Sequence, residues 1–171
     1  MKKIIDQQIF SRFKKAIRDY EMISDGDHLA VGVSGGKDSM VLLFLLDLFK
    51  KETPMDFSFT AITLDLGQGT DWKPLIDFCR EKKINFHLEQ TYINEIVFEI
   101  RKEKNPCSLC AKLRRGALHQ AALKFDCNKV ALGHHLDDVA ETFLMNLLQS
   151  GKLGSFSPAI YLSLSQLTLI R

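Results

Sequence analysis

A glycine-rich segment between two apolar runs constrains the fold of this chain more than any other feature. Residues 28–33 form a short apolar run, residues 34–39 have the sequence SGGKDS, and residues 40–49 are almost wholly apolar. Short apolar runs are typical of buried strands and longer ones of buried helices. The order therefore predicts a strand, a loop and a helix. The start of such a helix favours an anion, because its first N–H groups have no partners within the helix.

The loop has the side chains that a phosphate-binding loop needs. Lys37 supplies a positive charge, and the hydroxyls of Ser34 and Ser39 can donate hydrogen bonds. It is not a Walker A loop, which would need glycine at Val31 and serine or threonine at Asp38. The glycine spacing does not fit a dinucleotide fingerprint either. A tight strand-to-helix turn is the alternative, but it would explain only the two glycines.

Apolar segments of strand and helix type alternate along most of the chain. Residues 57–64, 84–88 and 129–133 resemble strands, and residues 71–82, 109–124 and 137–149 have helical periodicity. This alternation predicts an α/β fold with a doubly wound parallel sheet of the Rossmann-like kind, which binds ligands at the carboxyl ends of its strands. An N-terminal helix precedes it, since apolar residues recur at helical spacing from Ile5 to Tyr20; we expect that helix to end near Met22.

The expected domains are an N-terminal helix over 1–23 and a nucleotide-binding domain over 24–171. Residues 91–105 begin with helical spacing and end in charge, which suggests a mobile excursion, and residues 150–171 offer a loop and two short strands. Because the last strand-like run stops at Arg171, we expect the domain to be truncated at its C-terminal end. The chain has 171 residues and 46% hydrophobic content, enough for one core.

Overall charge and apolar run lengths narrow the class of protein. The net charge is only +2, so the whole molecule does not attract nucleic acid or membranes strongly, and an RNA contact must come from a local patch. The N-terminal residues mix charges into their apolar repeat, unlike a signal peptide, and no later run reaches membrane-spanning length. We therefore expect a cytoplasmic protein without a membrane partner, in which the four cysteines are not structural disulfides.

Acidic residues follow the strand expected at 129–133. Carboxylates at Asp137, Asp138 and Glu141 can share one helix face, and Glu141 with either aspartate could hold Mg²⁺ beside phosphates. Capping of the helix by Asp137 and compensation of its dipole by Asp138 explain the same residues without a metal. The preceding His134, in a loop at the same sheet edge as the glycine loop, favours the site.

A C-x-x-C pair precedes a basic stretch. Cys107 and Cys110 could chelate zinc or an iron–sulfur cluster, act as a redox pair, or be two reduced thiols in a loop. Cys79 has the spacing of a core residue, and Cys127 is ambiguous. The candidate RNA-binding residues follow the pair, with two further lysines upstream; a solvated helix face is the alternative. They are Lys112, Arg114 and Arg115, with Lys102 and Lys104 upstream.

Three motifs in order resemble a known family. SGGKDS (34–39) matches the signature of the PP-loop, or N-type ATP pyrophosphatase, superfamily, whose fold is the adenine nucleotide alpha hydrolase-like one. PCSLCAKLRRG (106–116) and GHHLDDVAET (133–142) are similar to the tRNA 2-thiocytidine synthetase group, as is LDLGQG (64–69). The resemblance covers most of residues 24–154. It implies an enzyme that adenylates a cytidine carbonyl oxygen of tRNA, releases pyrophosphate and lets sulfur displace AMP.

The resemblance also implies a set of cofactors, partners and site residues. ATP and Mg²⁺ would bind at the loop, with Lys37 and Asp38 catalytic, Asp65 near the ribose or adenine, and tRNA and a sulfur donor as partners; a homodimer remains open. In that group the C-x-x-C pair ligates a [4Fe-4S] cluster with a third, C-terminal cysteine, but no cysteine follows Cys127 here. A ligase or amidotransferase-like enzyme without sulfur chemistry and a non-catalytic ATP sensor are the alternatives. The expected nucleotide contacts are Val33, Ser34, Gly35, Gly36, Lys37, Asp38, Ser39, Asp65, Gly133 and His134.

Overall fold

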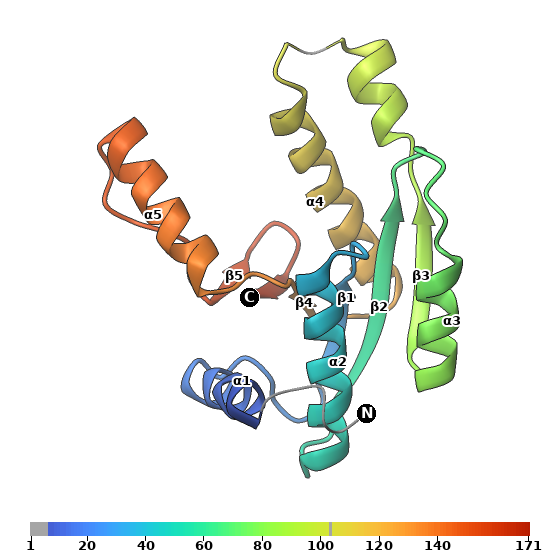
Figure 1. Cartoon of the computed structure of the whole chain (residues 1–171), viewed down its shortest axis with the longest axis vertical. Coiled ribbons are helices and arrows are strands. Elements are labelled where there is room, and N and C mark those ends of the chain that lie inside the picture. The colour runs from blue at the N-terminus through green and yellow to red at the C-terminus, as the bar shows by residue number, and fades with distance from the viewer. Residues whose placement is uncertain (1–6, 103) are drawn as a thin grey trace.

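A six-stranded, mostly parallel sheet forms the centre of the molecule (Figure 1). The computed structural model describes residues 7–102 and 104–171. The strand order is β3-β2-β1-β4-β6-β5, and only β5 is antiparallel to its neighbour. This arrangement confirms the predicted doubly wound sheet. The strands are β1 (His28–Gly32), β2 (Ser58–Asp65), β3 (Asn85–Gln90), β4 (Lys129–Ala131), β5 (Ala159–Leu162) and β6 (Leu167–Ile170).

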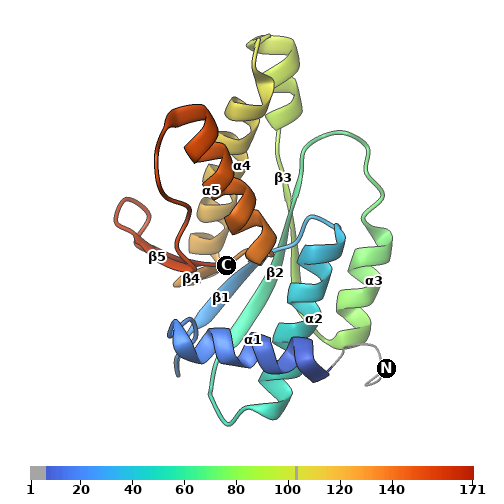
Figure 2. The same ribbon diagram turned by 60° about the vertical axis from the view of Figure 1, so that its left-hand side comes forward.

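Helices cover both faces of the sheet. Side chains of α1, α2 and α3 form a core on one face, around Leu43 and Leu46 of α2. On the other face, Leu118 and Ala122 of α4 pack with β4 and β6. Figures 1 and 2 show α4 behind the sheet and α2 with α3 in front of it. The helices are α1 (Gln7–Asp19), α2 (Lys37–Glu52), α3 (Lys73–Lys82), α4 (Pro106–Lys124) and α5 (Leu136–Ser150), with a π-helix η1 (Glu95–Ile100).

The chain reverses its direction of strand addition next to β1. It builds β2 and β3 on one side of β1 and then returns to place β4 on the other side. In doubly wound sheets the carboxyl ends of the strands at such a switch point frame the ligand crevice. The loops after β1 and β4 are the glycine loop and the segment of Gly133 and His134, so both flank this crevice.

The N-terminal helix is confirmed, but it ends at Asp19 and not near Met22. Glu21 takes a left-handed conformation with a φ of 49°, and the N–H of Met22 donates to the carbonyl of Ile17 at 2.9 Å. Such a bond satisfies a free carbonyl at a helix end. Ile5, the expected first apolar position, lies outside the described residues.

The observed bounds of α4 and β4 also differ from the predicted ones. Pro106 occupies the first turn of α4, where its missing N–H costs nothing, so the helix begins three positions before the expected residue 109. Cys107 and Cys110 consequently lie in a helix and not in a loop. β4 ends at Ala131, which leaves Gly133 in the following loop. Residues 91–105 contain η1; residue 103 is outside the described residues.

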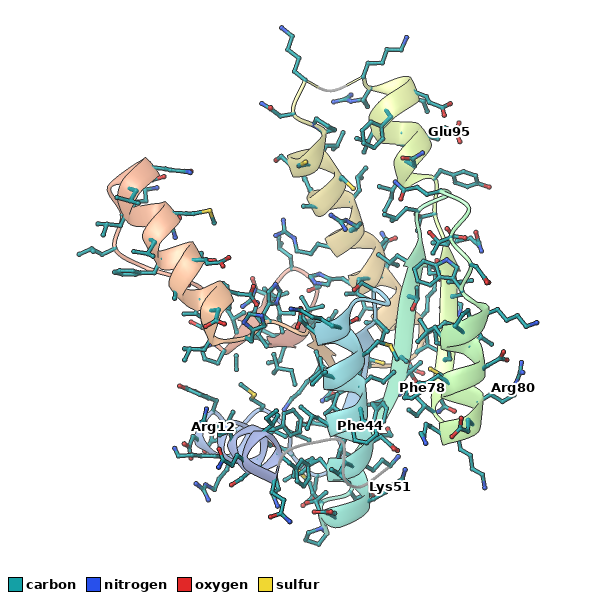
Figure 3. All side chains as sticks on the ribbon, viewed as in Figure 1. Arg12, Phe44, Lys51, Phe78, Arg80 and Glu95 are labelled. Carbon is teal, nitrogen blue, oxygen red and sulfur yellow. The ribbon has the colours of Figure 1, made fainter. Side chains whose placement is uncertain are left out.

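Helix α5 stands apart from the rest of the molecule (Figures 1 and 3). None of its residues is buried, and large apolar side chains such as Leu144 and Leu148 are exposed. The predicted loop and two short strands after α5 are present, the strands as β5 and β6. Among the described residues, no helix has the length and apolar character needed to cross a membrane.

Candidate nucleotide-binding site

The glycine loop is an open backbone turn held by its own serines. Gly35 has a φ of +78°, a conformation that glycine adopts without strain. The buried Ser39 hydroxyl donates to the carbonyl of Gly36 at 2.9 Å and accepts from the N–H of Ser34 at 3.2 Å. Ser39 therefore shapes the loop, whereas Ser34 is exposed together with both glycines. The exposed backbone can approach phosphate oxygens.

Lys37 does not stabilise the folded protein at its position. It is the first residue of α2, is exposed, and has no ion pair within residues 7–102 and 104–171. A cation at a helix N-terminus opposes the helix dipole, at a cost of about 0.3–1 kcal/mol. Asp38, in the same turn, is also exposed. An unpaired lysine at this position therefore favours the binding of an anionic ligand, although it slightly destabilises the helix of the free protein.

The loop after β4 lies directly against the start of α2. A Cβ added at Gly133 would meet the carbonyl carbon and oxygen of Asp38 at 2.9 Å and the nitrogen of Ser39 at 3.0 Å. His134 follows, its ring 5.3 Å from that of Phe156. Burial and then the charge of Arg171 lower the pKa of His134. The structure thus brings the predicted Gly133 and His134 to the glycine loop.

Gly133→Ala should separate the two loops. The added methyl group meets backbone and not a flexible side chain, so we expect the free energy of unfolding to fall by about 1–3 kcal/mol, with weaker nucleotide binding. Thermal unfolding followed by circular dichroism measures the change. Gly116→Ala is the matched control: it lies in α4 with nothing near its added Cβ, and should stabilise the helix by about 0.5–1 kcal/mol. Equal unfolding free energies for Gly133→Ala and the parent would contradict this close packing.

Trp72 is a loop neighbour that the sequence reasoning missed. A Cβ at Gly35 would lie 3.5 Å from Cζ3 of Trp72. The indole N–H of Trp72 is buried and has no hydrogen-bond partner among the described residues. Trp72 lies just before α3, far from the loop in sequence, so no sequence pattern indicated that it lies near the loop. Since it is the only tryptophan of the chain, its fluorescence can report on the loop.

Asp65 ends β2 and shapes the turn that follows. Its carboxylate accepts from the N–H of Gly67 at 3.0 Å, and its carbonyl accepts from the N–H and hydroxyl of Thr91. Asp65 lies at the carboxyl edge of the sheet, two strands from β4. Its predicted contact with ribose or adenine stays a prediction.

The acidic residues at the start of α5 act partly as a helix cap. Asp138 accepts from the N–H of His135 at 2.7 Å, so the capping role proposed as an alternative is present, made by Asp138 and not Asp137. Asp137 is exposed. In the described part of the chain, no group of three or more histidine, cysteine or acidic side chains is arranged to hold a metal. Mg²⁺ binding by Asp137, Asp138 and Glu141 stays a proposal that depends on phosphate oxygens as further ligands.

The four cysteines separate into two kinds. Cys107 is exposed and Cys110 half-buried in the first turns of α4, whereas Cys79 and Cys127 are buried, and burial raises the pKa of both to about 11. Iron–sulfur clusters need at least three protein ligands in almost all cases, and the described residues bring no third group to the exposed pair. The thiols of this chain alone therefore do not fit a [4Fe-4S] cluster.

The basic residues of α4 are exposed and free to meet a polyanion. Lys112, Arg114 and Arg115 form no ion pairs among the described residues. The neighbouring η1 region presents Tyr92 and Phe98, 75% and 52% exposed. Aromatic side chains of this kind can stack on unpaired bases, a feature that the basic stretch lacks in sequence.

These features define a doubly wound nucleotide-binding domain with a phosphate loop that is not of the Walker type. The chain belongs to the PP-loop domain family, an ATP-binding family whose pattern matches residues 5–171.

Curated relatives and solved structures support this membership. The chain is 37% identical to the tRNA-cytidine(32) 2-sulfurtransferase of Citrifermentans bemidjiense, over 98% of this chain and 68% of the relative. It is 38% identical to the enzyme of that name from Geotalea uraniireducens, over 98% and 69%. The U34-tRNA thiolase NcsA of Methanococcus maripaludis, solved with its [4Fe-4S] cluster, is 31% identical with a TM-score of 0.69, over 84% of this chain and 50% of NcsA.

A more distant structure is similar in fold alone. The NH3-dependent NAD synthetase of Campylobacter jejuni is 15% identical with a TM-score of 0.53, over 77% of this chain and 58% of that enzyme. The predicted Rossmann-like fold and PP-loop membership are both confirmed.

Proposed function

We propose that this chain is an ATP-dependent tRNA sulfurtransferase that adenylates a cytidine oxygen for 2-thiolation. The observation that carries the proposal is the unpaired Lys37 in an open glycine loop at the switch point of the sheet. The sulfurtransferase relatives and the exposed Cys107 and Cys110 support the choice of reaction. We expect a cytoplasmic enzyme with tRNA and a sulfur donor as partners.

The loop would bind the β and γ phosphates of ATP. Backbone N–H groups of Gly35 and Gly36 and the side chain of Ser34 would donate to phosphate oxygens, and Lys37 would neutralise charge that develops on the departing pyrophosphate. Asp38 would orient the reacting groups. Mg²⁺, when bound, would supply further charge neutralisation at the phosphates.

The chemistry would then proceed in two displacements. A cytidine carbonyl oxygen attacks the α phosphorus, and the bond to pyrophosphate breaks. A sulfur nucleophile from the donor next attacks the base carbon, and AMP departs with the electron pair of the C–O bond. Cys107 and Cys110 would hold this sulfur, and Lys112, Arg114 and Arg115 would bind RNA phosphates.

The cleavage position of ATP tests this function. With substrate tRNA, ATP labelled at the α or γ phosphate should give pyrophosphate in an amount equal to the adenylated and thiolated RNA together. Free AMP should match the thiolated RNA alone. Thin-layer chromatography separates these products. ADP and phosphate as the only products would contradict it, and AMP release without sulfur incorporation would favour a ligase.

A further inference from the structure

A polar cleft lies at the carboxyl ends of β2 and β3. Its volume is about 330 Å³, which is within the range of small-ligand sites. One wall is the turn after β2, and the other is the segment that runs from the end of β3 into η1. The side chains that line it include Gln90, Tyr92, Asn94, Glu95 and Glu99. The cleft thus contains hydrogen-bond donors, acceptors and an aromatic ring, the groups that recognise a nucleobase.

Hydrogen bonds join the two walls of the cleft. The N–H and the hydroxyl of Thr91 both donate to the carbonyl of Asp65, at 2.9 and 2.8 Å. The N–H of Asn94 donates to the carbonyl of Leu66 at 3.3 Å, and the side-chain amide of Gln68 donates to Oδ1 of Asn94 at 3.3 Å. The walls are therefore fixed relative to each other. Because Oδ1 of Asn94 already accepts a hydrogen bond, its NH2 group is the part of this amide that can donate to a ligand.

The π-helix η1 places two carboxylates along one wall. The N–H of Arg101 donates to the carbonyl of Ile96 at 2.9 Å, the five-residue spacing of a π-helix, and such turns occur frequently at functional sites. Glu95 and Glu99 are four positions apart, about one turn of this helix, and both are exposed and line the cleft. Carboxylates accept from the exocyclic amino group of cytosine, whereas uracil has an acceptor oxygen at the same place. These carboxylates therefore favour cytosine over uracil.

The cleft adjoins the elements that flank the glycine loop and the cysteine pair. Gly32, the last residue of β1, pairs with Ile62, and β2 continues three residues further to Asp65, which adds about 10 Å of strand above the end of β1. η1 contacts α4, and Figures 1 and 2 show it beside the first turns of that helix, where Cys107 and Cys110 lie. The cleft is thus bounded by β2, the neighbour of the strand before the glycine loop, and by η1, the neighbour of the helix with the cysteines.

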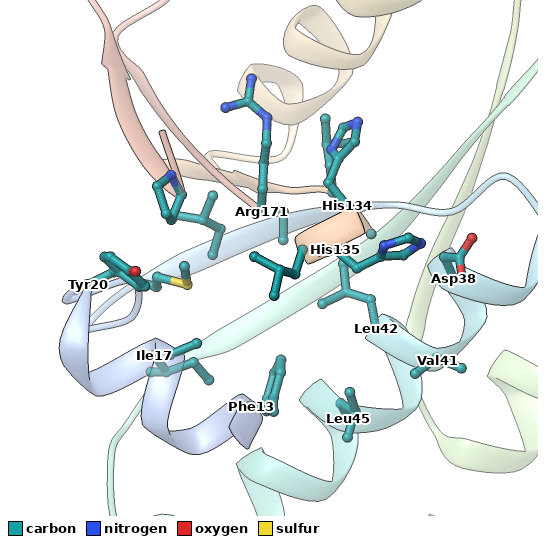
Figure 4. Close-up of a pocket in the computed structure, with 18 of the residues that line it drawn as sticks. Phe13, Ile17, Tyr20, Asp38, Val41, Leu42, Leu45, His134, His135 and Arg171 are labelled. Carbon is teal, nitrogen blue, oxygen red and sulfur yellow. The ribbon is translucent and has the colours of Figure 1, made fainter. Parts of the chain in front are cut away.

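A larger cavity on the other side of the glycine loop suits a base less well. It has a volume of about 560 Å³ and lies between α1, α2 and the segment before α5 (Figure 4). Most of its lining side chains are apolar, such as Phe13 and Leu45, and the polar ones include Asp38, His134 and Arg171. A base edge buried against apolar walls loses its water without gaining partners, which is costly. The polar cleft is therefore the better candidate for a base.

We propose that the polar cleft binds the target cytosine and distinguishes it from uracil. The proposal rests on the proposed function, which needs a cytidine whose O2 is free to attack the α phosphorus. The amino group at C4 would donate to the carboxylates of Glu95 and Glu99, and N3 would accept from the NH2 group of Asn94. Tyr92 would stack on the ring. Because O2 and the amino group lie on opposite sides of N3, O2 stays unbound to the glutamates and available for adenylation.

Two tRNAs that differ only in the target base test the proposal. One has cytidine at position 32, as in the names of the relatives, and the other has uridine there. Pyrophosphate release in a single turnover measures the adenylation rate with each. The parent should prefer the cytidine tRNA, and a double variant with Glu95→Gln and Glu99→Gln should lower this preference about 10- to 100-fold. The reason is that an amide can donate to uracil as well as accept from cytosine.

A double variant with Glu52→Gln and Glu81→Gln is the matched control. It removes the same charge at exposed positions of α2 and α3, and should keep the preference of the parent. Fewer negative charges strengthen RNA binding in both double variants, and the ratio of the two tRNAs cancels this effect. Tyr92→Ala should slow adenylation of both tRNAs about 5- to 100-fold, and Tyr92→Phe should restore it, because stacking does not depend on the base.

The fluorescence of Trp72 gives the ATP affinity of each variant, which should stay within about 2-fold of the parent. Circular dichroism checks folding, and the single variants Glu95→Gln and Glu99→Gln serve if the double variant does not fold. An unchanged preference in a folded variant overturns the proposal, as does a parent that adenylates both tRNAs at equal rates. A loss of ATP affinity as large as the loss of adenylation also overturns it, and would assign the cleft to the adenine of ATP. A parent that releases no pyrophosphate with either tRNA would contradict the proposed function itself.

Discussion

Replacing Lys37 by alanine should lower the rate of ATP cleavage about 30- to 1000-fold while the protein remains folded. The loss corresponds to about 2–4 kcal/mol, the scale for one donor at a developing anion. Stability should be unchanged or slightly higher, since Lys37 is exposed, unpaired, and opposed to the dipole of α2. Release of AMP in the presence of tRNA measures turnover, and thermal unfolding measures stability.

Lys51→Ala is the matched control for Lys37. Lys51 lies in the last turn of the same helix, at the opposite end from the loop (Figure 3), and its exposed side chain forms an ion pair with Asp47. Its loss should cost less than about 1 kcal/mol of stability and leave turnover unchanged. The fluorescence of Trp72 should change with ATP in the parent and control, and only at higher ATP in Lys37→Ala. Turnover of Lys37→Ala at the parent rate would exclude Lys37 from phosphate stabilisation.

The alternating fold and the nucleotide loop could be predicted because their signals are local. Apolar runs such as residues 28–33 and 57–64 are continuous in sequence, and the glycine loop lies between its strand and helix. The order of the motifs along the chain, which resembles that of a known family, supported the same prediction. The predictions that were wrong concerned the ends of helices, because a single residue can set where a helix starts or stops. Pro106 starts α4 earlier than its apolar pattern predicts, and Glu21 in the left-handed conformation follows the end of α1.

The missed parts of the site depend on contacts between distant segments. Trp72 reaches Gly35 from the start of α3, and Phe156 stands between His134 and Arg171 because β6 inserts beside β4. Strand order is set by packing on both faces of the sheet, and no periodicity along the chain encodes it. The sequence does not predict the π-helix η1 either, since its residues have ordinary helical spacing.

Replacing Cys107 or Cys110 by serine should remove RNA thiolation and spare nucleotide chemistry. The pair lies in the first turns of α4, and the hydrogen bonds that shape the glycine loop involve no residue of that helix. Thiolation should fall at least about 100-fold, because the remaining cysteines are buried, with pKa values of about 11, and cannot substitute as thiolates. Pyrophosphate release and ATP affinity should stay within about 2-fold of the parent.

Ser108→Ala is the control for the cysteine variants, since Ser108 is exposed between the two cysteines in the same helix. Parent, control and variants are incubated anaerobically with iron, sulfide, ATP and tRNA, and thiolated cytidine is measured by mass spectrometry after digestion of the RNA. Because Cys107 and Cys110 provide only two of the ligands that a cluster needs, iron binding by this chain alone should be weak. Cysteine variants that thiolate as well as Ser108→Ala would make the pair structural. The adenylating ligase would then be the better function for the same loop.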